Sequence, residues 1–189
     1  MLRAREPKML TREKAEHMLD AQTFEDAAKT LTDCGYEDMS QMSAKAVETA
    51  LSEHRAKIFS EMSRLAPNKA IVDVFRVKYD YHNAKTIVKA EAMNTDPASL
   101  LSDAGRMKGA ALLTAYQEDR TKEMPGRMGP AILEAKSVLA RTGNPQLADF
   151  VLDRAYFAEL TDMAAALDSR YLAGYAAVLI DSTNLRSAV

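Results

Sequence analysis

Two widely separated segments carry the same polar side chains at the same spacing. These side chains are Asp80, Asn83 and Lys85 in the first segment and Asp181, Asn184 and Arg186 in the second. Residues three apart lie on one side of a helix, so each Asp shares a face with its Asn. Asn is unfavourable inside a helix because its amide competes for backbone hydrogen bonds. We interpret both pairs as structural groups that bond to a neighbouring helix or cap its open end.

A ligand or metal site is the alternative interpretation of these pairs. One carboxylate and one amide per copy are too few for a hard cation, which needs about six oxygen ligands. The histidines His17, His54 and His82 are far apart, and none follows a carboxylate by three residues, which disfavours a di-iron bundle. The sequence also lacks a glycine-rich phosphate loop and the Gly-x-Ser-x-Gly and His-Glu-x-x-His motifs. We therefore predict no catalytic, cofactor-binding or metal-ligating residue, and a helical enzyme with an unusual site is the least favoured alternative.

Basic side chains recur along the helix that carries the first motif. Lys78, His82, Lys85 and Lys89 follow one another at steps of four, three and four, so they form one stripe. An ordinary solvated face is the simplest interpretation. A surface for an acidic partner is the alternative, and it predicts binding that weakens with salt.

The composition indicates a helical globular protein. The 189 residues are 47% hydrophobic and 28% charged, with 7 glycines and no tryptophan. The net charge of −2 gives no reason to expect a nucleic-acid partner. The single cysteine, Cys34, excludes an intramolecular disulfide and a multi-cysteine zinc site, and it is compatible with a reducing cytoplasm. No apolar run approaches the roughly 20 residues that cross a bilayer, so we expect any membrane association to occur through other proteins.

Capping residues, among them Thr11, Thr23 and Asn68, together with glycines such as Gly35 and with prolines, divide the chain into expected helices. The predicted helices cover residues 11–20, 23–35, 43–65, 68–93, 130–141, 145–167 and 169–189. We find no alternating segment long enough for a strand. The predicted fold class is all-α.

An internal repeat organises these helices into two units. Residues 77–88 match residues 178–189, and the same offset pairs Ile71 with Leu172 and Leu51 with Leu152. We therefore expect repeated helical bundles related by pseudo-symmetry, with units at residues 1–105 and 106–189. The helical pattern still runs at Val189 without a stop signal, so we expect the second unit to be incomplete and the chain to be a fragment.

Residues 79–85, Tyr-Asp-Tyr-His-Asn-Ala-Lys, resemble the Tyr-Asp-x-His-Asn-x-Lys signature of the C subunit of the prokaryotic V-type (A-type) ATPase. That family is the counterpart of the d subunit in the eukaryotic vacuolar pump. Residues 3–6, 10–11, 152–157 and 180–186 resemble further parts of the family pattern. The resemblance implies three related helical units, of which this chain holds the first and most of the second.

The resemblance also implies a function without catalysis or cofactors. Family members form a socket between the central rotor shaft and the membrane proteolipid ring, and they couple ATP turnover to ion transport. It implies a cytoplasmic protein held at the membrane by complex assembly, in which the repeated motif is structural. A helical-repeat adaptor for another protein is the alternative.

Overall fold

The computed structural model describes residues 2–188 and confirms the all-α fold class, since the described residues contain helices and no strand. By internal packing, the chain divides into two compact units, Met1–Arg55 and Ala56–Val189. The predicted boundary between residues 105 and 106 concerns repeat units, and it stays a prediction.

The N-terminal unit begins with the 3-10 helix η1 (Leu2–Lys8), followed by α1 (Arg12–Leu19) and α2 (Phe24–Asp33). Two threonines cap these helices as the sequence predicts: Thr11 Oγ1 accepts a bond from the amide of Lys14, and Thr23 Oγ1 accepts one from Asp26. Helix α1 packs on α2. Helix α3 (Ala44–Leu65) starts in this unit and crosses its boundary.

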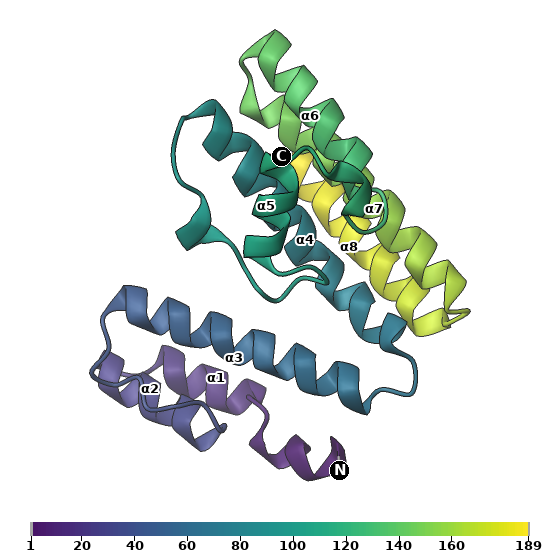
Figure 1. The fold of residues 1–189 in the computed structure, drawn as a ribbon. Helices are drawn as coiled ribbons and strands as arrows, with labels where there is room; N and C mark the ends of the chain where they lie inside the picture. Colours follow the sequence, from purple (N-terminus) through teal and green to yellow (C-terminus); the bar gives the residue numbers. More distant parts are fainter. Residues whose placement is uncertain (1, 189) are drawn as a thin grey trace. The chain divides into compact units, whose positions relative to one another are not determined.

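The C-terminal unit is a helical bundle with one buried apolar core. Its elements are α4 (Lys69–Ala92), η2 (Ala98–Leu100), α5 (Gly109–Gln117), η3 (Thr121–Glu123), α6 (Met128–Thr142), α7 (Pro145–Ala166) and α8 (Arg170–Ala188). Figure 1 shows α6, α7 and α8 side by side, and α7 packs on α4, α6 and α8. The core between these helices includes Val77, Leu112, Ile132, Leu152 and Leu160, each fully buried.

Helix α4 has more buried residues than any other described helix of this unit, because it is apolar around much of its circumference. Ten of its residues are buried, and two of them, Asp80 and Asn83, are polar. Asn68 caps its start by accepting a bond from the amide of Ala70. Both copies of the repeated motif are helical, in α4 and in α8. Whether these helices hold corresponding places in two bundles stays a prediction.

Candidate functional site

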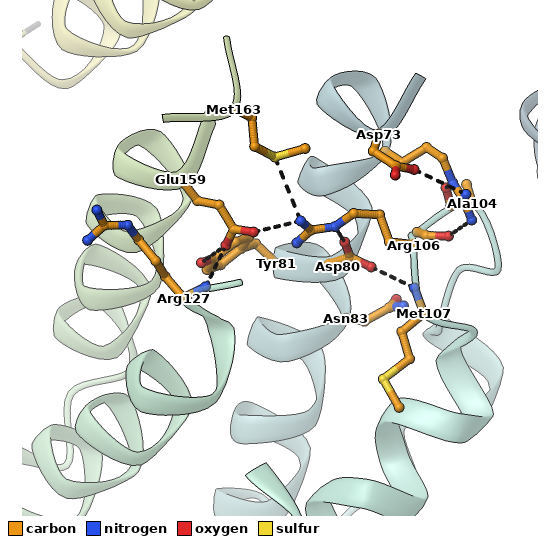
Figure 2. A network of polar contacts seen from close by, with 12 residues as sticks. Asp73, Asp80, Tyr81, Asn83, Ala104, Arg106, Met107, Arg127, Glu159 and Met163 are labelled. Carbon is orange, nitrogen blue, oxygen red and sulfur yellow. Dashed lines mark hydrogen bonds and ion pairs between the residues drawn. The ribbon is translucent and has the colours of Figure 1, made fainter. Parts of the chain in front are cut away.

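A buried group of charged side chains joins α4 to α7. Asp80 on α4 is fully buried, and Glu159 on α7 is 4% exposed. Arg106, from the loop before α5, lies between them: its Nε donates to Asp80 Oδ2 and its Nη1 to Glu159 Oε1, both over 2.6 Å (Figure 2). We call Asp80, Arg106 and Glu159 the charge cluster.

Glu159 also accepts hydrogen bonds from two further donors, one on α4 and one at the start of α6. Tyr81 on α4 donates its hydroxyl to Glu159 Oε2 over 2.7 Å, and the backbone amide of Arg127 donates to the same oxygen over 2.9 Å. Arg127 is the N-cap residue of α6, where the helix macrodipole favours negative charge. Two carboxylates share one guanidinium, so the charge cluster carries one excess negative charge, which these donors stabilise.

Burial shifts the protonation equilibria of these groups. Removal from water raises the pKa of Asp80, and Arg106 opposes this effect only in part. Burial alone would lower the pKa of Arg106, but its bonds to Asp80 and Glu159 raise it above the ordinary value. Burial and the neighbouring Glu159 carboxylate raise the pKa of Tyr81. The tyrosine therefore stays protonated and able to donate its hydrogen bond to Glu159.

Two glycines let the backbone approach the charge cluster. A Cβ atom on Gly105 would overlap Asp80 Oδ1, and one on Gly126 would overlap the carboxylate of Glu159. Gly126 also has a φ of +60°, in the left-handed region that disfavours side chains. A side chain at position 105 or 126 would therefore overlap the carboxylate of Asp80 or Glu159, respectively.

A loop lies along the face of α4 that carries Asp80 and Asn83, and we call residues 101–108 of this loop the strap segment. Asn83 holds one end, because its amide donates to the carbonyl of Ser102 and accepts from the amide of Ser102, both over 2.8 Å. Arg76 donates to the carbonyls of Ala104, over 3.3 Å, and Gly105. The amide of Met107 donates to Asp80 Oδ1 over 3.2 Å at the other end. Together with Arg106, these bonds fix the strap segment along α4.

The predicted basic stripe has a mixed environment. Lys85 and Lys89 donate to Asp153 and Asp149 of α7, each over 2.6 Å. The exposed Lys78 lies over the ring of Tyr79, and the exposed His82 contacts the carbonyl of Leu100 through Nε2. Two members of the stripe therefore bind carboxylates within the chain, which adds to the attachment of α4 to α7. A role of the stripe toward an acidic partner stays a prediction.

The second copy of the motif is not part of this site. Asp181, Asn184 and Arg186 are exposed on α8, whereas Asp80 and Asn83 are buried. The structure brings Asp80 and Asn83 together with Arg106 and Glu159, which sequence analysis did not single out. The one local signal for Arg106 is the glycine before it. Glu159 gives no comparable signal, because it is one of four acidic residues in α7, with Asp149, Asp153 and Asp162.

The arrangement attaches helices to one another. Both carboxylates bind the same guanidinium, so α4 and α7 are joined through the loop before α5. Within residues 2–188, no three His, Cys, Asp or Glu side chains are grouped so that they could ligate a metal ion. Over the same residues, every helix is too short or too polar to span a bilayer.

Comparison with known proteins identifies relatives along the whole chain. The family model described as "ATP synthase (C/AC39) subunit" matches residues 1–189. The C subunit of the V-type sodium ATPase of Enterococcus hirae is 24% identical over 186 residues, which cover 98% of this chain and 57% of the relative. The C subunit of the V-type ATP synthase of Thermus thermophilus is 25% identical over 150 residues, 75% of this chain and 46% of the relative.

A third relative matches a smaller part of this chain. The C subunit of the A-type ATP synthase of Thermococcus kodakarensis is 26% identical over 113 residues, which cover 56% of this chain and 31% of the relative. The chain thus spans about half the length of the curated relatives it matches. No solved structure matches it. Because the family model covers the full sequence, the chain belongs to the ATP synthase (C/AC39) subunit family.

Proposed function

We propose that this chain acts as a non-catalytic subunit of a rotary V/A-type ATPase. In this proposal it forms part of the central-stalk socket that couples the rotor shaft to the membrane proteolipid ring during ion transport. The observation that carries the proposal is the match of the family model to all 189 residues. The names of the relatives, which are C subunits of V-type and A-type enzymes, support the assignment to such a complex.

The packing of the C-terminal unit supports a load-bearing role. A socket that transmits torque has to resist relative movement of its helices, and close packing provides that resistance. The charge cluster joins α4 to α7 through a buried guanidinium, while Lys85 and Lys89 join the same helices nearer the surface. The proposed location is the cytoplasmic side of the membrane, with attachment through the shaft and the ring.

Binding to purified complex components tests this proposal. The chain is mixed separately with the rotor-shaft proteins and with the detergent-solubilised proteolipid ring of its own source, and each mixture is analysed by gel filtration and light scattering. We expect a stoichiometric complex with each component and no ATP hydrolysis by the chain alone. If the chain binds neither the rotor-shaft proteins nor the proteolipid ring, the socket role is contradicted and the helical-repeat adaptor is favoured. ATP turnover by the chain alone would contradict the non-catalytic assignment.

Charge reversal on the predicted stripe sharpens this test. Lys78 and His82 are the exposed members of the stripe, so the double change Lys78→Glu, His82→Glu reverses its accessible charge without breaking the ties to α7. If an acidic partner binds there, the affinity should fall, and salt should weaken the wild-type complex. Lys122→Glu changes an exposed lysine elsewhere and should leave the affinity unchanged.

A further inference from the structure

The charge cluster contains more negative than positive charge in a largely buried region. Asp80 is fully buried, Glu159 is 4% exposed, and both carboxylates depend on the single guanidinium of Arg106. An excess buried charge is unfavourable, and a carboxylate can remove it by binding a proton. The question is which carboxylate would bind that proton.

The hydrogen bonds distinguish the two carboxylates. Glu159 accepts from Arg106, from the Tyr81 hydroxyl and from the backbone amide of Arg127 at the start of α6. Asp80 accepts from Arg106 over 2.6 Å and from the Met107 amide over a longer 3.2 Å. Asp80 is thus the more buried and the less well solvated anion. Burial raises its pKa, in agreement with this difference.

We propose that Asp80 is a proton-operated latch: one proton bound to its carboxylate releases the Met107 end of the strap segment from α4 while the helical bundle stays folded. The proton comes from solvent and adds to Oδ1, the oxygen without a charged partner. Protonation turns Oδ1 from a carboxylate oxygen into a neutral hydroxyl oxygen, which is a weaker acceptor, so the 3.2 Å bond from the Met107 amide is weakened.

Arg106 can then form a second arrangement of bonds. Its Nη2 atom is buried and has no hydrogen-bond partner among the described residues. When Asp80 loses its charge, this free donor allows Arg106 to bind Glu159 with two parallel N–H groups. The remaining carboxylate and guanidinium then form a neutral pair, and the excess charge of the cluster is gone.

Other charged groups near Asp80 do not replace it as the proton acceptor. On its own helix, the half-exposed Asp73 pairs with Arg76, and Tyr81 faces Glu159. From the start of α6, the guanidinium of Arg127 pairs with the exposed Asp162. Arginine and tyrosine do not titrate in the acidic range. The bonds between Asn83 and Ser102 involve no charged group, so they do not respond to the proton. The strap segment therefore begins to separate from α4 at its Met107 end.

Nuclear magnetic resonance of the full chain tests the latch. Carboxyl-carbon shifts report the protonation of Asp80 and of Asp96, an exposed reference in the same loop region. Amide exchange, expressed as a protection factor, reports the Met107 bond. We expect Asp80 to bind its proton at higher pH than Asp96. Over that pH range, protection at Met107 should fall by about fivefold to tenfold, while Leu160 in the core of α7 stays protected.

Two variants separate the latch from general acid sensitivity. Asp80→Asn has no charge to lose, so the pH dependence of Met107 protection should disappear. Asp162→Asn removes an exposed carboxylate and should leave that dependence unchanged. The proposal is overturned if Asp80 titrates at or below the pH of Asp96, or if Met107 stays protected throughout. Simultaneous loss of protection at Leu160 also overturns it. If Asp80→Asn does not fold, the wild-type titration alone decides, and none of these outcomes depends on the proposed function.

Discussion

Replacing Arg106 by methionine should destabilise the C-terminal unit more than any surface change of the same kind. Methionine keeps much of the side-chain length but removes the charge that Asp80 and Glu159 share. Both carboxylates would stay buried, with one backbone donor each from Met107 and Arg127. Breaking a buried ion pair by removing one partner costs about 3–5 kcal/mol. We expect the free energy of unfolding to fall by that amount.

The matched control makes the same substitution at an exposed pair. Arg154 binds Glu134 over 2.7 Å, but their side chains are 72% and 53% exposed. Because water screens such a pair, Arg154→Met should cost less than about 1 kcal/mol. The difference between the two variants measures the effect of burial on an arginine–carboxylate contact.

Equilibrium unfolding in urea, followed by near-ultraviolet circular dichroism of tyrosine, measures this difference. Of the seven tyrosines, only Tyr36 precedes residue 56, and the chain has no tryptophan, so the signal reports the C-terminal unit. If Arg106→Met and Arg154→Met agree within a few tenths of a kcal/mol, the charge cluster does not stabilise the fold and our reasoning is wrong. Adding Asp80→Asn and Glu159→Gln to Arg106→Met should restore part of the loss, because no unpaired charge then remains.

Three further predictions follow from the same region. Asn83→Ala should lower the free energy of unfolding by about 1–3 kcal/mol, because the buried N–H and C=O groups of Ser102 lose their partner. In the same urea assay, Asn184→Ala at the exposed repeat position should change that free energy by less than about 0.5 kcal/mol. Gly126→Ala and Gly143→Ala both place a methyl group at a φ near +60°, but only the methyl group at position 126 overlaps a carboxylate, that of Glu159. Gly126→Ala should therefore lower the free energy of unfolding by at least about 1 kcal/mol more than Gly143→Ala. Equal losses of stability in the two variants would refute the packing argument. Burial and the Glu159 carboxylate raise the pKa of Tyr81, so its stabilising effect is present below the ordinary tyrosine pKa of 10.0 and is lost as the pH rises through the raised value. Burial raises the pKa of Tyr116 and Tyr156 as well, so phenolate absorbance should show a late phase that becomes smaller by one tyrosine in Tyr81→Phe. A late phase of unchanged size in that variant would speak against the argument.

Seven of the eight α-helices in residues 2–188 were predictable because local chemistry sets their ends, whereas α5 (Gly109–Gln117) was not among the predicted ranges. Thr11, Thr23 and Asn68 each cap the helix that the sequence assigned to them, and Gly35, at a φ of +86°, follows the end of α2. These signals act over a few residues, so they can be interpreted without knowledge of the tertiary structure. The all-α class follows from the same signals and is confirmed.

The charge cluster was only half predictable. Asp80 and Asn83 stood out because polar residues inside an apolar helix need a partner, but the partner of Asn83 is a loop peptide at Ser102 instead of a neighbouring helix. Arg106 and Glu159 lie 53 residues apart, and each is an ordinary charged residue in its local sequence. The packing of α4 against α7 and the attachment of the strap segment to α4 bring them together, and no periodic sequence pattern predicts either contact.

The two copies of the motif show that side-chain type alone does not define the site. Asp80 and Asn83 are buried because the strap segment lies across them and supplies Arg106 and the amides of Ser102 and Met107. Asp181 and Asn184 have the same spacing on α8 but are exposed, so they have no such environment in the described chain. The structural unit is therefore the helix together with the strap segment, and an equivalent site on α8 would require a segment that brings a cation and backbone donors to Asp181.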